Sequence, residues 1–584
     1  MSAAFLLAML CVLATWLLWA GVLTGWGLLG LRLLRLTETT TDRFWWSFWS
    51  GFGFLTIFFQ IWHCLLPINA WATAVAFAVG LTGLACCGSK PVSLWRVLRD
   101  WLKRRPYAWI WVLIAGFWLA NHACGPNTWP DSFSYHLTAV QWTREHPIVP
   151  GLVNLHMRLG FNCSAYLYLA LVDQGPWLGR YTHFAHGVFA WMVAGYIIES
   201  ACRFFERTGA ARWRAFFTVG WLMPLTVIVR AHLLSTTATD YLAILLVLVA
   251  AGGLLELADP EQPSERKRFL LLVISLLTAV AVSVKASNLF FATAAIPLAA
   301  FFALTHSKVR WRTVFVAAAL IAAVVLPWLA RNVVLTGYPL YPSGVAAFPV
   351  DWREPTERVA ELNRIFRDWV RGVPDSSSRW DWIGTWWNLR VTKYDARWWM
   401  LGPLIATGIG IVAALPRLRR WRELPQALKR GLWLALPLTF ALVCWFLTSP
   451  GPRYAAQFFW LAAALAWMVA AAQWCMGTSK RVLIPLLVLW LAYGSFPFIW
   501  QFRWKKTWLK PGTDYGYHPT EAPGRVVEYV TASGLRLYVP AEGKPCATTE
   551  LLYTPEPDKR IRLRRNDDLS GGFTMQPETP QNGF

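Results

Sequence analysis

Long apolar stretches recur along almost the entire chain, and they constrain the fold more than any other feature. A helix needs about 20 apolar residues to cross the hydrocarbon core of a bilayer. Several of the stretches are short or joined by tight turns, so the sequence predicts an all-α polytopic membrane protein with about 12 to 14 transmembrane helices. The stretches lie at 3–30, 48–65, 70–87, 107–121, 181–199, 214–229, 239–257, 269–284, 288–304, 313–330, 398–415, 431–448, 454–472 and 482–500.

The composition agrees with a membrane location. Hydrophobic residues make up 56% of the chain and charged residues only 15%, whereas an average soluble protein carries about 25% charged residues. The 39 tryptophans are of the type that gathers at membrane–water interfaces. These values exclude a disordered chain, a collagen-like chain and a disulfide-dense secreted scaffold.

The positive charge, a formal net +23, is concentrated in alternate loops. One set of loops holds 27 lysines and arginines in 95 residues, and the intervening short loops hold 6 in 81. Short basic loops stay in the cytoplasm, so the N-terminus, the two large loops 122–180 and 331–397 and the tail after residue 500 are expected outside. This distribution argues against nucleic acid as a partner. The basic set comprises 31–47, 88–106, 200–214, 258–268, 305–313, 416–430 and 473–481.

The pattern divides the chain into three parts. Residues 1–106 form N-terminal transmembrane helices, 107–500 form a transmembrane core with the two large loops, and 501–584 form an external, partly β tail. The first apolar stretch lacks a basic n-region, so we expect a retained helix and not a cleaved signal. Elements expected outside the membrane are two surface-lying helices at 131–144 and 162–172, a charged helix at 355–372, and strands at 526–530 and 535–539.

The ten cysteines contain no CxxC pair and no spacing typical of a metal site. Cys124 and Cys163 share one external loop, where the compartment permits a disulfide. Whether the two form one is left open by the sequence.

Polar residues are unusually dense in the first large loop. Asp131 follows a proline at the start of a helical run, so it is a candidate general base and equally a candidate helix N-cap. Potential hydrogen-bonding partners stand around it in the same loop: Tyr135, His136, Asn154, His156 and Arg158.

Other external edges add cations and a second acid. Asp240 begins a span, where a capping role is again an alternative. Lys285 lies in a turn of a few residues, where it either binds an anion or extends toward lipid headgroups. Three cations at one membrane level could bind a phosphate headgroup. The candidates at these edges are His232, Asp240, Lys285, Arg331, Asn332, Tyr338 and Arg453.

A span, then an external loop opening with an aspartate and a surface helix, precedes Pro327-Trp328-Leu329-Ala330-Arg331-Asn332 and Gly337-Tyr338-Pro339-Leu340-Tyr341-Pro342. This order resembles the GT-C superfamily of integral-membrane glycosyltransferases, including its protein O-mannosyltransferase, aminoarabinose transferase and RgtA/B/C/D-like branches. The resemblance covers roughly 107–475. It departs from the family where Ser132 replaces a second acid beside Asp131 and where three extra spans precede the core. The tail, with its Arg562–Leu569 segment before Gly571-Gly572-Phe573, is similar to a poorly characterised bacterial membrane-protein family.

The resemblance implies transfer of a sugar from a polyprenyl-phosphate donor to a glycan, lipid or protein acceptor at the external face of a bacterial inner membrane. Asp131 would accept the acceptor's proton, and Lys285, Arg331 and Arg453 would hold the lipid phosphate. Tyr135, His136, Asn154 and His156 would orient sugar or acceptor. The Trp-rich loop 331–397 would stack on sugar rings or seat the prenyl chain, with an interfacial aromatic belt as the alternative.

Cofactor use and some function classes stay open at this point. A divalent metal on Asp131, His136, His156 and Asp240 is compatible with the sequence, but no spacing requires it. A polysaccharide polymerase or ligase would share the donor and the topology. A transporter or lipid-carrier flippase should carry ionisable residues near the bilayer midplane and repeat symmetry, which the nearly acid-free spans disfavour. A non-catalytic scaffold is the remaining alternative. The sugar, the acceptor and the oligomeric state are not specified by the sequence.

Overall fold

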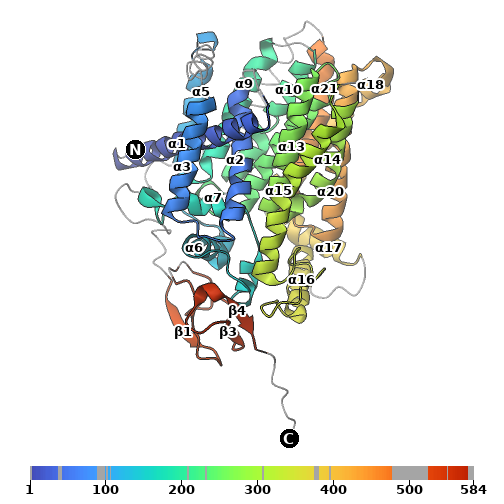
Figure 1. Ribbon diagram of the computed structural model, residues 1–584. Helices are drawn as coiled ribbons and strands as arrows, with labels where there is room; N and C mark the ends of the chain where they lie inside the picture. The colour runs from blue at the N-terminus through green and yellow to red at the C-terminus, as the bar shows by residue number, and fades with distance from the viewer. Residues whose placement is uncertain are drawn as a thin grey trace.

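The computed structural model describes residues 3–36, 42–87, 99, 103–105, 107–206, 209–230, 233–305, 308–373, 380–392, 396–476, 524–546, 548 and 550–576. Within these ranges the chain is mainly a bundle of helices with a small β region at one end (Figure 1). The longer helices are α1 (Ala3–Leu33), α2 (Arg43–Trp62), α3 (Ala70–Cys87), α5 (Ala108–Ala123), α9 (Gly187–Glu206), α12 (Thr239–Leu257), α13 (Ser264–Val284), α14 (Leu289–Leu304), α15 (Trp311–Thr336), α18 (Gly402–Arg419), α20 (Ala435–Thr448) and α21 (Ala456–Met476).

These helices confirm the membrane class. In the part of the chain that the structure describes, nine helices are long and apolar enough to cross a membrane, and two shorter apolar helices correspond to α3 and α5. Every stretch expected up to residue 472 falls on helix. The stretch 214–229 is divided at Gly220 into α10 (Gly209–Val219) and α11 (Leu222–Arg230), and 482–500 lies outside the described residues. The figure of 12 to 14 spans therefore stays a prediction.

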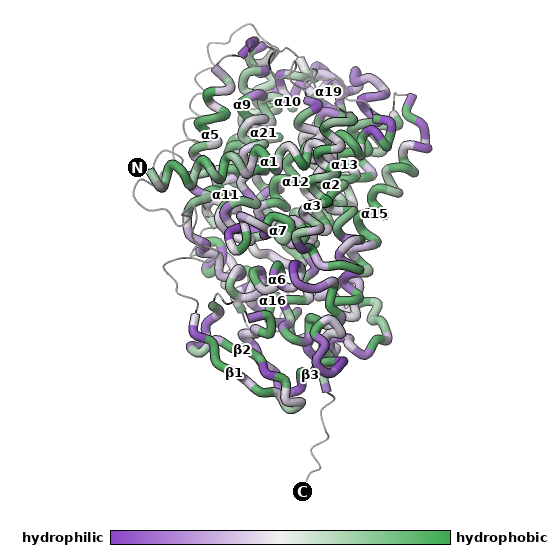
Figure 2. Tube along the Cα trace, turned by 60° about the vertical axis from the view of Figure 1, so that its left-hand side comes forward, coloured by the Kyte–Doolittle hydropathy of each residue, from purple (hydrophilic) through white to green (hydrophobic). Residues whose placement is uncertain are grey.

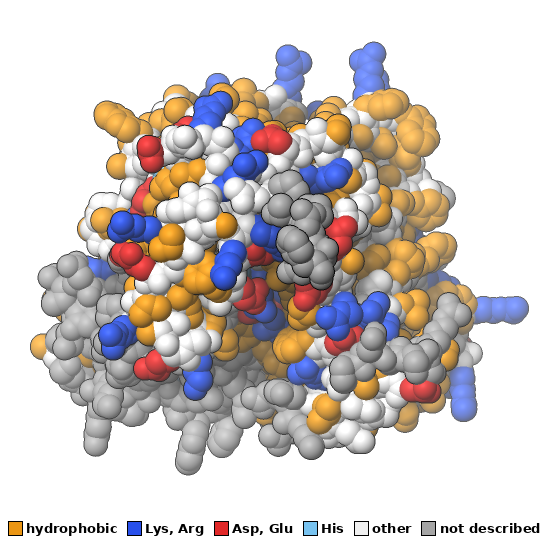
Figure 3. Space-filling view, turned by 90° about the horizontal axis from the view of Figure 1, so that it is seen from below, with side chains coloured by type: hydrophobic (Ala, Val, Ile, Leu, Met, Phe, Trp, Pro, Cys, Tyr) orange, Lys and Arg blue, Asp and Glu red, His pale blue; other side chains and the backbone are white. Residues whose placement is uncertain are grey.

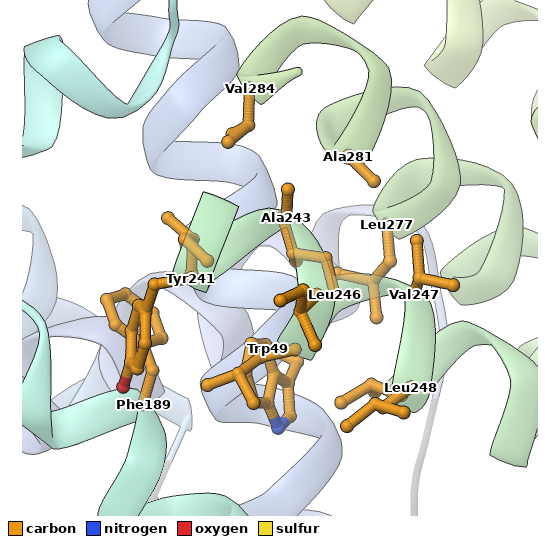
Figure 4. Packing of buried hydrophobic residues seen from close by; sticks show 14 of the residues in the cluster. Trp49, Phe189, Tyr241, Ala243, Leu246, Val247, Leu248, Leu277, Ala281 and Val284 are labelled. Carbon is orange, nitrogen blue, oxygen red and sulfur yellow. The ribbon is translucent and has the colours of Figure 1, made fainter. Parts of the chain in front are cut away.

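The centre of the bundle is built on α12 and α13. Of their most apolar windows, 89% and 94% of the residues are buried. A helix that is apolar on all sides must be surrounded by other helices or by lipid, and α12 is surrounded by helices. Figure 4 shows this packing, with Trp49 of α2 and Phe189 of α9 against Tyr241 and Leu246 of α12 and with Leu277 of α13 beside them.

The N-terminal helices approach each other closely enough to require glycine. A Cβ on Gly25 of α1 would lie 1.8 Å from the carbonyl oxygen of Gly80 in α3. A Cβ on Gly51 of α2 would lie 1.7 Å from the carbonyl oxygen of Leu23 in α1. Small residues allow such backbone contact between membrane helices, where van der Waals packing is a main source of association.

The two ends of the bundle are hydrophilic and the middle is hydrophobic (Figure 2). Loops that the charge pattern assigns to one side meet at one end, which we call the basic end. There Arg214 Nη1 donates to Asp259 at 2.8 Å and Arg430 Nη2 donates to Thr305 at 2.9 Å. These contacts bring four of the seven basic loops together, while the placement of the others and the assignment of this end to the cytoplasm stay predictions.

The opposite end, here called the cap end, carries α6 (Leu137–Glu145), α16 (Thr356–Arg371), α17 (Trp382–Trp386) and the strands, while α7 (Ala165–Val172) lies further into the bundle (Figure 1). Strands β1 (Val526–Val530) and β2 (Arg536–Pro540) pair antiparallel, as do β3 (Ile561–Leu563) and β4 (Phe573–Met575). The predicted strands and the charged helix at 355–372 are confirmed. Both large loops and the described part of the tail meet at this end.

The strands are fastened to the loops by backbone and side-chain contacts. The backbone N–H of Phe573 donates to the carbonyl of Pro150 at 3.0 Å, and Trp142 Nε1 donates to the carbonyl of Leu551 at 3.1 Å. Arg564 and Asp351 form an ion pair at 2.8 Å. The described part of the tail is therefore a cap docked on both loops.

The structure corrects one expectation about the first loop and answers the question left open for its two cysteines. All eight residues of α7 are buried, so this helix does not lie on the membrane surface. Its residues are apolar on every side, and such a helix is stable only when it is enclosed. Cys124 and Cys163 are both buried free thiols, and Cys163 Sγ donates instead to the carbonyl of Val284 at 3.1 Å.

A buried acid at the cap interface gives a pH-dependence prediction. Glu354 is fully buried, and burial raises its pKa from 4.5 to about 7, although Arg358 Nε stands 3.0 Å away and acts in the opposite direction. A raised pKa means that the folded protein holds the proton more tightly than the unfolded chain. The resulting stabilisation is complete below pH 4.5 and is lost as the pH rises through 7.

We expect Glu354→Gln to remove this dependence. Between pH 4.5 and pH 8, the free energy of unfolding of the wild type should fall by up to about 3 kcal/mol relative to that of the variant. Thermal unfolding of both proteins across this range measures the difference, because other titrating groups contribute equally to both. Parallel curves for the two proteins would show that Glu354 does not titrate in this window.

Candidate functional site

Five charged side chains from distant segments meet at the cap end. Asp131 lies between two arginines, with Oδ1 3.5 Å from Nη1 of Arg158 and Oδ2 3.3 Å from Nη2 of Arg453. Asp240, at the start of α12, forms an ion pair with Lys285, which follows α13. We call these five residues the charged cluster. Tyr454 joins its two halves, because Lys285 Nζ is 4.7 Å and Arg453 Cζ 5.1 Å from the centre of its ring.

The local structure decides between the alternatives left open for the acids and the lysine. The Asp131 side chain accepts no capping hydrogen bond at the start of the π-helical turn Ser132–His136. The N-cap position of α12 is Ala238 and not Asp240. Lys285 is paired with Asp240 and so does not extend to headgroups. Both acids are therefore held by cations, and neither acts as a helix cap.

Aromatic rings enclose both arginines of the cluster. Arg453 Cζ lies 5.1 Å from the ring centre of Trp129 and 5.6 Å from that of Trp369. Arg158 Cζ lies 5.9 Å from the ring centre of Tyr135. A guanidinium over a ring face is attracted by the ring quadrupole. The rings thus fix the two arginines in place without neutralising their charge.

His136 lies next to the charged cluster and is linked to Thr237 and Ser132 by successive hydrogen bonds. Thr237 Oγ1 donates to Ser132 Oγ at 2.9 Å, which leaves the Thr237 oxygen to accept from His136 Nδ1–H at 3.1 Å. Burial lowers the pKa of His136 to about 4, even though Asp131 and Asp240 act in the opposite direction. His136 is therefore neutral at physiological pH, with its proton on Nδ1.

Tyr135 also lies against the cluster. Burial, followed by the neighbouring charge of Asp131, raises the pKa of Tyr135 well above its usual range. Its hydroxyl therefore keeps its proton at physiological pH. With neutral His136, it supplies uncharged polar groups beside the charged side chains.

The charged cluster is accessible from solvent and carries excess positive charge. The exposed side-chain fractions are 24% for Asp131, 30% for Arg158, 26% for Arg453 and 19% for Lys285. Three cations face two carboxylates, so one positive charge is uncompensated within the cluster. Figure 3 views the cap end, where acidic and basic side chains gather in a hollow near the middle of the face. Such a site attracts an anion.

Several predicted site residues lie elsewhere and have structural partners. Asn154 Nδ2 donates to the carbonyls of Trp352 and Phe573, at 2.9 and 3.2 Å. His156 is buried, with Nε2 3.9 Å from Glu556 of the cap, and burial lowers its pKa to about 3. These two side chains thus stand at the junction between the first loop and its neighbours.

The residues predicted near the C-terminal end of α15 and just after it also have structural partners. Asn332 Nδ2 donates to the carbonyl of Pro339 at 2.7 Å, and the hydroxyl of Tyr338 donates to the carbonyl of Glu354 at 3.0 Å. Both bonds stabilise the chain reversal that follows the helix. Arg331 is buried beside His63, outside the charged cluster. His232 lies outside the described residues.

Sequence reasoning missed the aromatic residues that hold the cluster. Trp129, Trp369 and Tyr454 are distant in sequence and meet only around Arg453. The one sequence signal for any of them was the high tryptophan content of the 331–397 loop, which contains Trp369. Within the described ranges no group of three or more His, Cys, Asp and Glu side chains is arranged to hold a metal ion.

A family model described as a domain of unknown function (DUF8201) matches residues 9–460. No curated protein and no solved structure matches the chain.

Proposed function

The chain belongs to the DUF8201 family, and we propose that it is an integral-membrane glycosyltransferase that moves a sugar from a polyprenyl-phosphate donor to an acceptor hydroxyl at the cap end. The observation that supports this most is the charged cluster, in which a solvent-accessible carboxylate lies between two arginines at the end of an apolar helical bundle. The order of segments that resembles GT-C enzymes supports the same activity.

The lipid phosphate would be held by Arg158, Arg453 and Lys285. The two arginines already bind an oxyanion, the Asp131 carboxylate, but at the long distances of 3.5 and 3.3 Å. A phosphate offers more oxygen acceptors and more charge, so it would replace Asp131 as their partner. Arg331, which the sequence grouped with these cations, is buried beside His63 and is not assigned to this phosphate.

Once released from the arginines, Asp131 would act as the general base. The acceptor oxygen attacks the anomeric carbon while the bond from that carbon to the phosphate oxygen breaks. Asp131 takes the hydroxyl proton, and the cations stabilise the charge on the departing polyprenyl phosphate. Neutral His136, whose Nδ1–H is committed to Thr237, keeps Nε2 free to accept a hydrogen bond from a sugar or acceptor hydroxyl.

The membrane orientation follows from the charge distribution. The rule that short basic loops remain in the cytoplasm would place the basic end inside and the cap end outside. With the GT-C resemblance, the proposed location is a bacterial inner membrane whose external face holds the site. The acceptor, whether a glycan, a lipid or a protein, would approach beside the cap.

The donor site is tested by binding of polyprenyl phosphate to the protein in nanodiscs. We expect saturable binding that Arg453→Gln weakens at least tenfold, because a charge-assisted hydrogen bond to phosphate contributes about 1.5–3 kcal/mol. Arg420→Gln is the matched control, since Arg420 is an exposed arginine at the basic end. Equal affinity for all three proteins would remove the phosphate site, and transport would then be the better hypothesis.

A further inference from the structure

A small cavity lies beside the charged cluster and is separated from it by aromatic rings. Phe161 and Tyr166 line the cavity. The ring centre of Phe161 is 5.8 Å from that of Tyr135, and the ring centre of Tyr166 is 5.7 Å from that of His136. Arg331 lines the same cavity, so we call it the Arg331 cavity. Its volume is about 30 Å³, which is room for about two water molecules or for one ion of similar size.

The hydrogen-bonding partners of Arg331 are neutral. Its Nε donates to Asn162 Oδ1 at 3.2 Å, and its Nη1 donates to His63 Nδ1 at 2.6 Å. His63 Nδ1 must therefore be the unprotonated ring nitrogen, while Nε2–H donates to the carbonyl of His146 at 3.1 Å. His63 is thus held as the neutral tautomer, and the charge of Arg331 is not shared with it.

Nothing in the described part of the chain neutralises this guanidinium. Arg331 is only 4% exposed, and no described carboxylate lies within ion-pair distance of it. A buried, uncompensated charge is strongly destabilising, and an ionisable residue at membrane depth generally marks a functional site. The guanidinium therefore lacks an anionic partner that the described residues do not supply.

The side chains around the cavity leave donor groups unused and leave their acceptors occupied. Asn162 Oδ1 and His63 Nδ1 both accept from Arg331 itself. The hydroxyl of Tyr166 has no hydrogen-bond partner among the described residues, so it and the guanidinium retain N–H or O–H groups for a ligand. A site that combines free donors with a positive charge selects an anion. The lining donors that already bond to backbone carbonyls are His63 Nε2, Trp142 Nε1, Thr143 Oγ1, Asn162 Nδ2 and Cys163 Sγ.

We propose that the Arg331 cavity binds one small monovalent anion, with chloride as the representative of this class. A halide fits a space of one or two water molecules, whereas a phosphate or an organic acid exceeds it. Its single negative charge balances the single guanidinium and accepts hydrogen bonds from Arg331 and Tyr166. Apolar neighbours such as Ile148 and Leu335 lower the local dielectric and so strengthen this attraction. The proposal does not depend on the glycosyltransferase activity.

The test measures chloride binding by the broadening of the chlorine NMR signal. The protein is kept in zwitterionic nanodiscs and sodium gluconate, whose anion is too large for the cavity, and chloride replaces gluconate at constant ionic strength. We expect saturable broadening that bromide reverses and that Arg331→Gln abolishes. Tyr166→Phe should weaken chloride binding at least about threefold, because it removes a hydrogen bond to a charged ligand. Tyr168→Phe is the matched control, since the hydroxyl of Tyr168 donates to the carbonyl of Ala185 and Tyr168 does not line the cavity.

Thermal unfolding gives a second measurement and separates this site from the charged cluster. Chloride should raise the unfolding temperature of the wild type relative to gluconate, because a ligand that binds only the folded state stabilises it. Arg453→Gln should keep this rise and the chloride affinity of the wild type, while its polyprenyl-phosphate binding falls.

Three results would overturn the proposal. The first is an absence of saturable chloride binding to the wild type. The second is chloride binding that Arg453→Gln abolishes and Arg331→Gln retains, which would move the anion to the charged cluster. The third is equal chloride affinity in Tyr166→Phe, Tyr168→Phe and the wild type, which tests the site even if Arg331→Gln fails to fold.

Discussion

Asp131→Asn is expected to abolish sugar transfer and, at the same time, to tighten the binding of polyprenyl phosphate. The amide has no basic oxygen, and loss of a general base costs about 10²–10⁴-fold in rate. The tightening follows from the geometry, because Asp131 now occupies Arg158 and Arg453. An amide competes poorly for the two guanidinium groups, so an incoming phosphate meets less competition.

The measurement combines turnover with binding in the same preparation. Proteoliposomes are given a panel of labelled polyprenyl-phosphate sugars, and single-turnover release of polyprenyl phosphate is followed alongside its equilibrium binding. Glu423→Gln, an exposed acid at the basic end, is the control. Loss of both turnover and binding would indicate a structural role for Asp131, and full turnover would remove it from the reaction.

The charged cluster was largely predictable because chain order determines which loops share an end. Asp131, Asp240, Lys285 and Arg453 each follow or begin an apolar stretch. Once the spans are counted, alternate loops must lie on the same side of the membrane. The prediction needed the order of the spans but no detail of their packing. The structure places all four residues together.

The predicted site residues that the structure places away from the charged cluster depend on pairings between distant segments. Arg331 was grouped with the other cations by its level in the membrane, but its partner His63 lies 268 residues earlier in the chain. Asn154 bonds to carbonyls of the second loop and of the cap. Hydrogen-bond partners so far apart leave no local pattern, so the sequence cannot distinguish a site residue from a structural one.

The secondary-structure predictions also depended on whether the information was local to the segment. The helix at 355–372 and the strands at 526–530 and 535–539 carry their own periodicity and turns, and the structure contains them. The helix at 162–172 has no polar side, and an eight-residue apolar helix fits either the membrane surface or a protein core. The surrounding helices decide in favour of the core.

A substitution that breaks the ion pair between Asp240 and Lys285 is expected to lower the stability of the protein more than one that breaks a more exposed ion pair. Asp240 is almost fully buried and Lys285 largely so. Asp240→Asn leaves the lysine facing Arg453 without its carboxylate, and removal of one partner from a buried pair costs about 3–5 kcal/mol. The double variant Asp240→Asn/Lys285→Met removes both charges and should recover most of that loss. Asp351→Asn, which breaks the more exposed pair with Arg564, should cost less than about 1 kcal/mol.

Thermal unfolding of the single and double variants gives the coupling energy of this pair, and polyprenyl-phosphate binding to the double variant gives the role of Lys285. A stable double variant with weakened phosphate binding would mean that Asp240 holds Lys285 in place for the ligand. A stable double variant with wild-type binding would make the pair structural and leave the phosphate to Arg158 and Arg453. A loss in the double variant equal to the sum of the losses in Asp240→Asn alone and Lys285→Met alone would contradict the pairing itself, because coupled charges must deviate from additivity.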